Sequence, residues 1–133
     1  MKLFSKKEAL KVKSIPLDPN MVADPKTAVD YYRRGVAYYA RRKYDLAIDD
    51  LKQATALDGQ LVDGYYSLGM VLKAIRRNEE AVIAFQKVVD FTTMGAGGGK
   101  VAANMLRRLA LGHINMLTQG DWNLEKEIWK HID

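Results

Sequence analysis

The sequence contains no cysteine, and its three prolines all lie before residue 26. The absence of cysteine excludes disulfide bonds and thiolate metal sites. The two histidines, His113 and His131, are too few for a metal cluster by themselves, so we expect neither a metal nor a cofactor. Because proline most reliably interrupts helices, its absence from residue 26 onward allows long helices through most of the chain.

The lysine-rich start of the chain is followed by no long apolar run. Nothing there reads as a signal-peptide core or a membrane span, and we expect a cytoplasmic protein. The 133 residues, 48% of them hydrophobic, are enough for one buried core and too few for two ordinary domains. The net charge of +5 is concentrated in residues 1–27, a basic extension with six lysines and three carboxylates.

The middle of the chain repeats itself with a period of 34 residues. One shift superimposes Tyr31 on Tyr65, Tyr32 on Tyr66, Gly35 on Gly69, Ala40 on Ala74, Ala47 on Ala81 and Leu51 on Phe85. Within each unit, two sets of apolar residues follow helical spacing on either side of a polar break, which predicts a pair of helices. A period in this range is typical of helical solenoids.

Gly35 and Gly69 fall in the middle of predicted helices, where glycine costs about 1 kcal/mol relative to alanine. We therefore expect each glycine to allow close approach to the second helix of its own unit, at Ala47 or Ala81. An ordinary helical bundle with this spacing by chance is the alternative, but too many positions agree in one register to favour it.

These units resemble the tetratricopeptide repeat, whose pattern has an aromatic residue, Leu-Gly, a tyrosine, an alanine, an aromatic residue or leucine, and another alanine. The second unit fits through Tyr65, Leu68, Gly69, Ala81 and Phe85, and the first through Tyr31, Gly35, Tyr38, Tyr44, Ala47, Leu51 and Ala54. Arg34 replaces the usual leucine, and we expect it to face a partner, a carboxylate such as Asp49 or Asp50, or the leading segment. The resemblance implies an all-α fold, a short right-handed α-α superhelix.

The resemblance also implies two clear repeats, residues 28–61 and 62–95, behind the basic extension. A glycine-rich loop at residues 95–99 then leads to a degenerate, capping pair in residues 100–133. This third unit has a Leu111-Gly112 pair and a Gly120-Asp121-Trp122 turn that are similar to family signatures. Its closing helix is expected to carry Trp122, Leu124, Ile128, Trp129 and Ile132. A third unit is expected because about three repeats are needed for stability.

The glycine-rich stretch before Lys100 is a poor match to a phosphate-binding loop. That motif needs a preceding strand, a glycine where the chain has Met94, and a Ser or Thr where it has Val101. The carboxylate pairs Asp49-Asp50 and Glu79-Glu80 are expected to face solvent, and no catalytic constellation can be assembled with them. We therefore predict that the protein is not an enzyme.

In tetratricopeptide proteins the first helix of each pair lines a concave groove, so the resemblance implies a peptide-binding site there. The matching positions are Val29, Tyr32, Val36, Tyr39, Asp63, Tyr66, Met70, Lys73, Leu109, His113 and Met116. Some members grip a terminal carboxylate with lysine and asparagine at places held here by Tyr32, Val36 and Ser67, so we do not expect that activity. His113 either contacts a ligand or packs, and residues 13–19 of the same chain are an alternative occupant of the groove.

A basic edge is expected because Arg42-Lys43 and Arg76-Arg77 are also separated by 34 residues and would stack along the turns of a solenoid. An acidic protein, nucleic acid or an anionic membrane could bind such an edge. Cations also complement the dipole at a helix end and keep a turn solvated. The second explanation is favoured, and nucleic acid is not favoured as a partner, because no aromatic residues interleave the basic ones.

We predict a protein-protein interaction module, an adaptor or scaffold that binds a peptide or helical segment in an apolar, tyrosine-lined groove. The alternatives are a structural homo-oligomer, for example a homodimer, and a binder of an acidic partner, nucleic acid or anionic membrane through the basic edge. A weak membrane-surface contact through residues 1–12 is a further alternative, against disorder or packing of this segment on the repeats.

Overall fold

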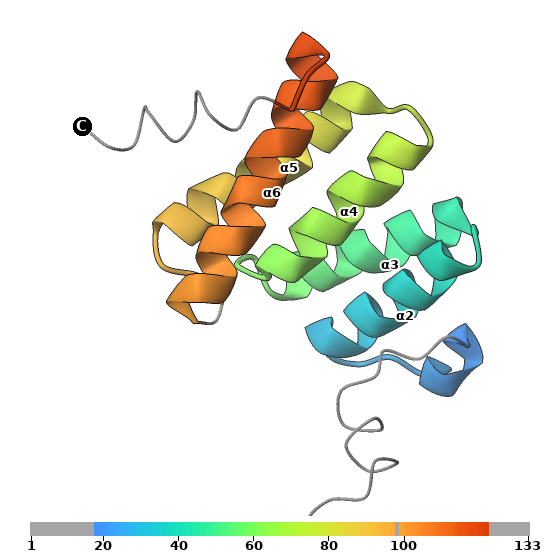
Figure 1. Ribbon diagram of the computed structural model, residues 1–133. Helices are drawn as coiled ribbons and strands as arrows, with labels where there is room; N and C mark the ends of the chain where they lie inside the picture. The colour runs from blue at the N-terminus through green and yellow to red at the C-terminus, as the bar shows by residue number, and fades with distance from the viewer. Residues whose placement is uncertain (1–17, 98, 123–133) are drawn as a thin grey trace, which may run out of the picture.

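The computed structural model describes residues 18–97 and 99–122, and every regular element in this part of the chain is a helix (Figure 1). The elements in chain order are the 3-10 helix η1 (Pro19–Val22) and the α-helices α2 (Ala28–Ala40), α3 (Tyr44–Leu57), α4 (Val62–Ala74), α5 (Asn78–Thr93) and α6 (Lys100–Gln119). Helices α2 and α3, and then α4 and α5, form two hairpins, and α6 packs against α5. This arrangement confirms the predicted all-α solenoid.

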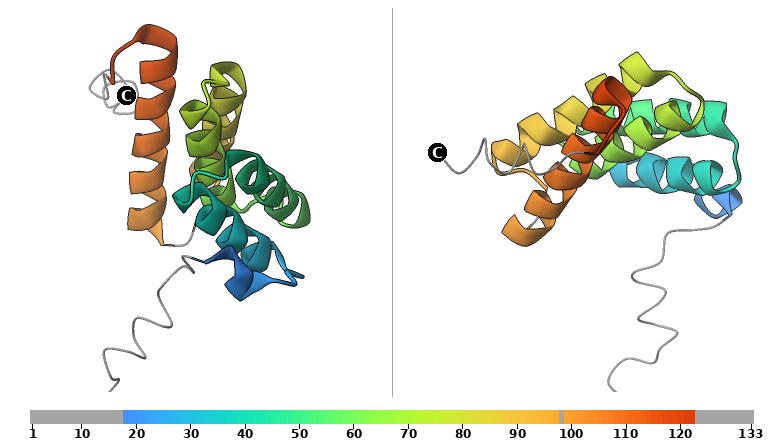
Figure 2. Two further views of the ribbon diagram at one scale, coloured as in Figure 1. Left: turned by 90° about the vertical axis from the view of Figure 1, so that its right-hand side faces the viewer. Right: turned by 45° about the horizontal axis from the view of Figure 1, so that its top comes forward.

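The helices lie in two layers. Helices α2, α4 and α6 form the layer nearest the viewer in Figure 1, and α3 and α5 lie behind them. The hairpins are joined by contacts between α3 and α4, and η1 contacts α2 at the start of the stack. Figure 2 shows α6 at the opposite end of the stack from η1. The outer surface of the front layer is called the α2/α4/α6 face below.

Helix α2 begins with a reciprocal cap formed by Thr27 and Asp30. The Thr27 hydroxyl accepts a hydrogen bond from the Asp30 N–H at 3.1 Å, and the Asp30 carboxylate accepts one from the Thr27 N–H at 3.2 Å. Backbone hydrogen bonds from Lys26 and Thr27 lower the pKa of Asp30. The cap satisfies N–H groups that the first turn of a helix leaves unpaired.

Both hairpin turns have the same backbone geometry. After α2, Arg42 adopts a left-handed φ of 61°, and the N–H of Lys43 donates to the carbonyl of Tyr38 at 2.9 Å. After α4, Arg76 adopts a φ of 64°, and the next N–H makes the equivalent bond, also at 2.9 Å. These bonds satisfy carbonyl groups at the C-terminal end of each first helix. The repeat therefore extends to the hydrogen bonds of the turns.

The hydrophobic core lies between the two layers. Its largest fully buried side chains are Leu51, Val71, Leu72, Phe85 and Val88. Gly35 and Gly69 let the layers approach, since a Cβ atom on Gly35 would lie 2.8 Å from Leu51, and one on Gly69 would lie 2.8 Å from the ring of Phe85. The expected approach to the second helix of each unit is confirmed. The closest side chains are Leu51 and Phe85, one turn beyond Ala47 and Ala81.

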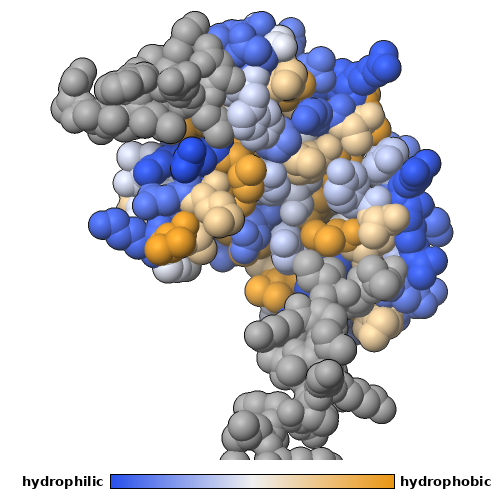
Figure 3. Space-filling model, viewed as in Figure 1, coloured by the Kyte–Doolittle hydropathy of each residue, from blue (hydrophilic) through white to orange (hydrophobic). Residues whose placement is uncertain are grey.

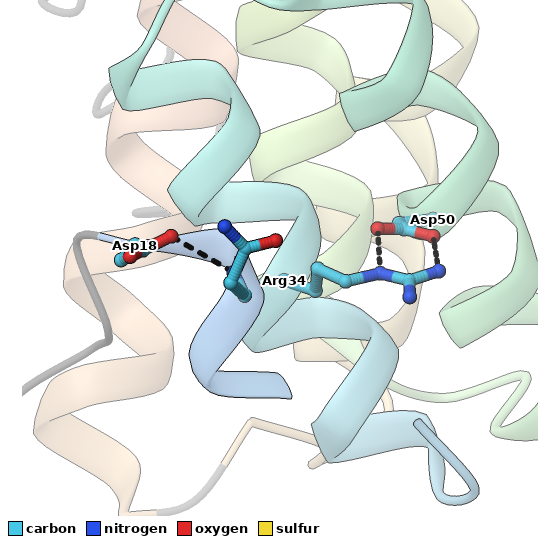
Figure 4. A network of polar contacts seen from close by, with 4 residues as sticks. Asp18, Arg34 and Asp50 are labelled. Atoms are coloured by element: carbon cyan, nitrogen blue, oxygen red, sulfur yellow. Dashed lines mark hydrogen bonds and ion pairs between the residues drawn. The ribbon is translucent and has the colours of Figure 1, made fainter. Parts of the chain in front are cut away.

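Asp50 corrects a sequence-based prediction, because it is buried and does not face solvent. Its carboxylate accepts hydrogen bonds from Arg34 Nε and Nη2 at 2.7 and 2.8 Å (Figure 4). The rings of Tyr31 and Tyr38 lie 5.8 and 5.9 Å from the guanidinium carbon of Arg34. Of the partners considered for Arg34, the structure therefore selects the carboxylate of Asp50, because α3 packs along α2 and carries this residue on its inner side.

Residues 18–27 are the part of the leading segment that the structure describes, and they begin with η1 and its cap. Pro19 is buried, and Asp18 caps η1 by accepting a hydrogen bond from the Asn20 N–H at 2.9 Å (Figure 4). Residues 1–17 lie outside the described residues. Occupation of the groove by residues 13–19, and a membrane contact through residues 1–12, therefore stay predictions.

The loop between α5 and α6 is rich in glycine, as the sequence shows. Gly95 and Gly97 adopt left-handed φ values of 96° and 104°. A Cβ atom on Gly97 would lie 3.0 Å from Val62, so the loop packs over the start of α4. A helix precedes this loop, whereas a phosphate-binding loop of the type considered above follows a strand.

Helix α6 supplies the first helix of the predicted third unit. It ends at Gln119 and is capped by Gly120, whose φ of 80° is left-handed. Gly112 lies against Trp122, and a Cβ atom on this glycine would overlap the indole ring. The remaining residues of the predicted closing helix, Leu124, Ile128, Trp129 and Ile132, lie outside the described residues.

Candidate functional site

The residues predicted to line a groove lie on the three helices that form the α2/α4/α6 face. Val29, Tyr32, Val36 and Tyr39 belong to α2, Asp63, Tyr66, Met70 and Lys73 to α4, and Leu109, His113 and Met116 to α6. Val29, Asp63, Leu109 and Met116 are exposed, His113 is buried, and the others are half-buried. In Figure 3, apolar and weakly polar side chains cross the middle of this face, and strongly hydrophilic side chains gather at its right-hand edge.

Tyrosine side chains join α2 to α4 across this face. Tyr32 lies beside Ser67 and Asp63 of α4, and burial, together with the charge of Asp63, raises the pKa of the Tyr32 hydroxyl. Tyr66 lies near Tyr39 of α2, and burial, with a smaller contribution from Tyr39, raises the pKa of the Tyr66 hydroxyl. Both hydroxyls are therefore protonated and uncharged at neutral pH. The face offers flat aromatic surface with hydrogen-bonding ends.

His113 is the centre of a cluster that joins α4, α5 and α6. Its side chain lies among neighbours that leave the residue 7% exposed. Its ring stacks on Phe85 at a centroid distance of 4.7 Å and an angle of 12°, and Trp122 meets it edge-on at 4.8 Å. Nε2 lies 3.1 Å from the Tyr66 hydroxyl oxygen, and Nδ1 lies 3.1 Å from the Lys73 Nζ. These contacts fit the packing role considered for His113.

The partners of His113 fix its protonation state. Burial in the first place, and the charge of Lys73 in the second, lower the pKa of His113 to about 4. The imidazole is therefore neutral at neutral pH. An ammonium group can only donate, so Nδ1 accepts from Lys73, and Nε2 carries the proton that it donates to the Tyr66 hydroxyl.

Leu109 lies beside a second apolar feature of α6. It borders a shallow hollow on the surface of this helix, formed with Val101, Asn104, Met105 and Arg108. Val101 is 77% exposed and Met105 is 62% exposed. The hollow contains no residue of α2 or α4, so these apolar side chains form a surface of their own on α6.

The four residues predicted to form a basic edge are all exposed at the two hairpin turns. Arg42 and Lys43 line one hollow together with Ile75, so the first turn lies next to the end of α4. Arg77 donates two hydrogen bonds to the carboxylate of Glu80, at 2.8 and 2.7 Å. The first turn therefore lies near the residue that follows α4, and the charge of Arg77 is balanced by a neighbouring carboxylate.

The bond between Lys73 and His113 is absent from the sequence-based predictions, although both residues were named. Its two partners lie 40 residues apart and on helices from different units. Trp122 was predicted only as part of a closing helix, yet it covers Gly112 and His113. The small residue at Gly112 was the signal that a large ring could lie there, but the sequence does not identify which ring.

Two hairpins of the same geometry, stacked in order and followed by a further helix, define an α-helical repeat protein. The sequence pattern of the tetratricopeptide repeat matches residues 28–61 and, a second time, residues 62–92. The chain belongs to the tetratricopeptide repeat family.

The chain is similar over part of its length to two curated proteins. The chain is 49% identical over 51 residues to neutrophil cytosol factor 2 of Mus musculus, which is 38% of this chain and 10% of that protein. It is 35% identical over 66 residues to small glutamine-rich tetratricopeptide repeat-containing protein 2 of Saccharomyces cerevisiae, which is 50% of this chain and 19% of that protein. The chain thus spans no more than about a fifth of the length of these two relatives.

A solved structure shares the fold. The crystal structure of MamA superimposes with a TM-score of 0.55 over 94% of this chain and 87% of that chain, at 21% sequence identity. At this identity the likeness shows the fold alone. Among the residues that the structure describes, no helix has the length and apolar character needed to cross a bilayer.

Proposed function

We propose that this chain is a protein-protein interaction module that holds a peptide or helical segment of a partner on the α2/α4/α6 face. The observation that carries the proposal is the set of half-buried tyrosines, Tyr32, Tyr39 and Tyr66, which come from adjacent helices and share this face with Met70. The proposal gives the chain a binding role and no catalytic step. Family membership supports this role, and the groove residues are part of the proposal.

The physical basis is the low entropic cost of aromatic anchors. A tyrosine has only two side-chain torsions, and a ring that already packs on the core loses little freedom when a ligand covers it. The three tyrosines are packed against core residues, so their exposed edges are held in place before binding. Large fixed side chains of this kind carry most of the binding energy at interfaces.

The extent of the module is part of the proposal. We propose one domain, with repeats at residues 28–61 and 62–95 and a capping unit in residues 100–133, behind the basic extension of residues 1–27. The end of α5 at Thr93 and the start of α6 at Lys100 support a boundary at the glycine-rich loop. A cytoplasmic location stays a prediction.

A peptide library displayed on phage tests the proposal. The parent chain should enrich peptides with large apolar residues, and the variant Val29→Glu should lose them, because Val29 is 48% exposed on α2. The matched control is Ile83→Glu, a β-branched residue that is 62% exposed on α5 of the back layer. Equal recovery by the two variants, with both folded by circular dichroism, would count against the α2/α4/α6 face.

A homo-oligomer is a second candidate, and the exposed apolar side chains of α6 favour it. Val101 and Met105 would be buried in such an interface. Multi-angle light scattering over a range of concentrations tests it, and a monomer at every concentration would remove it. The basic edge has less support as a binding site, because Glu80 already balances Arg77.

A further inference from the structure

We propose that the Lys73 ammonium group, held by His113 at the surface of the α2/α4/α6 face, pairs with the carboxylate of an acidic side chain in the bound peptide. This inference rests on the proposed function and adds the chemistry of the ligand. It makes Lys73 and Tyr66 the specificity-determining residues of the face.

Lys73 is a half-buried cation without a carboxylate partner in the described part of the chain. The three ion pairs found among those residues are Lys26–Asp24, Arg34–Asp50 and Arg77–Glu80. The contact of Lys73 with His113 Nδ1, at 3.1 Å, leaves its charge in place, because the imidazole is neutral. A cation that has lost part of its hydration gains most from an anionic partner.

The charges of α4 are separated along the face. Asp63 is in the first turn of this helix and Lys73 is in its last turn. Ten residues at about 1.5 Å per residue put roughly 15 Å between the two positions, too far for a direct pair. Asp63 therefore does not neutralise Lys73, and a complementary peptide carries its negative charge beside Lys73.

The direction of the hydrogen bonds at His113 leaves the Tyr66 hydroxyl as a second donor. Since Nδ1 accepts from Lys73, Nε2 donates to the Tyr66 oxygen, at 3.1 Å, and the hydroxyl hydrogen of Tyr66 is left free to donate. Lys73 and Tyr66 thus present donors from the two ends of one imidazole ring. A carboxylate carries a negative charge and acceptors only, so it pairs with the Lys73 ammonium group better than an amide or an amine does.

The aromatic neighbours hold this arrangement in place. Phe85 stacks on one side of the His113 ring, and Trp122 meets the ring edge-on. Asn115 donates a hydrogen bond to the Trp122 carbonyl at 3.2 Å, which ties the tryptophan to α6. An imidazole fixed in this way keeps both donors at set positions before a ligand arrives, which lowers the entropic cost of binding.

The occupant is an internal acidic residue of the peptide. Apolar and aromatic residues lie on all three helices around Lys73: Tyr39 on α2, Met70 one turn before Lys73 on α4, and Met116 one turn beyond His113 on α6. A peptide that covers them continues on both sides of its acidic residue. The peptide terminus is not the expected ligand, because a carboxylate that lies between apolar anchors belongs to a side chain within the peptide.

Selection from a phage-displayed random peptide library, followed by calorimetry, provides the test. The parent should enrich a glutamate or aspartate between apolar residues, and changing that residue to glutamine should weaken binding about tenfold. With Lys73→Met the two peptides should bind equally, and Lys73→Arg should restore the difference. The control Lys87→Met, on α5, should behave like the parent.

Three results with peptides overturn the inference: no acidic enrichment, the same tenfold loss with Lys73→Met, or a loss that follows amidation of the peptide terminus. The first two leave apolar peptide binding, and so the proposed function, standing. Sodium acetate is a probe that does not depend on peptide binding. NMR signals of Lys73, Tyr66 and His113 should move with acetate and not with sodium chloride at the same ionic strength, and identical behaviour in both salts also overturns the inference.

Discussion

The ion pair between Arg34 and Asp50 replaces an apolar pair of the second repeat. Shifting both positions by 34 residues gives Leu68 and Ala84, which are both buried. Arg34→Leu leaves the Asp50 carboxylate, 7% exposed, without its partner. We expect this change to lower the free energy of unfolding by about 3 kcal/mol or more, because an uncompensated buried charge is left behind.

The reverse change is expected to cost less. Asp50→Ala leaves Arg34, whose side chain is 22% exposed and lies beside the rings of Tyr31 and Tyr38. The guanidinium group can turn toward water, so we expect a loss of about 1 to 2 kcal/mol. The double variant Arg34→Leu/Asp50→Ala reproduces the pair of the second repeat and should come within about 1 kcal/mol of the parent.

Urea unfolding followed by circular dichroism measures all four proteins of this cycle. The singles and the double together should give a coupling energy of about 3 kcal/mol. If Arg34→Leu costs no more than Asp50→Ala, or if the two single effects add up to that of the double variant, the buried charge of Asp50 does not depend on Arg34.

Three further predictions concern single residues. His113 has a folded pKa of about 4, below its ordinary value of 6.5, so its contribution to stability is present above pH 6.5 and is lost as the pH falls toward 4. In acid unfolding of the parent this loss of stability should reach about 3 kcal/mol, and much of the pH dependence should vanish in His113→Gln. Gly69→Ala should lower stability by about 1 kcal/mol or more, because its Cβ atom would lie 2.8 Å from a buried ring, whereas Gly59→Ala, with nothing within 4 Å, should change the melting temperature little. Arg42→Gly and Arg76→Gly should each raise the stability by about 0.5 to 1 kcal/mol in urea unfolding, because both arginines have left-handed φ values, and a decrease would show that their side chains stabilise the turns.

The fold was predictable because it follows from local pattern. The matching positions of Gly35 and Gly69, with apolar residues at helical spacing around them, identify two helices per unit and the close approach between them. The left-handed turns were less accessible to prediction, since Arg42 and Arg76 stand where glycine would be the usual signal. The evidence that the fold requires a left-handed residue in these turns is that both turns have one at the same position.

The candidate site was predictable only as a set of helix positions. The assignment of Lys73 and His113 to one face follows from the repeat, but their hydrogen bond depends on how α6 packs beside α4. The solvent-facing position predicted for Asp50 was wrong for the same reason, because its burial depends on Arg34, which lies 16 residues away. Contacts between helices are set by packing, and a single helical pattern does not contain them.

The most direct test of the central claim is NMR chemical-shift mapping with a peptide selected from the displayed library. Amide signals of α2, α4 and α6 should shift on binding, with the largest changes around Tyr32, Tyr66 and Lys73, and signals of the outer surfaces of α3 and α5 should stay in place. Shifts centred on α3 and α5, or on the basic turns, would contradict the assignment of binding to the α2/α4/α6 face.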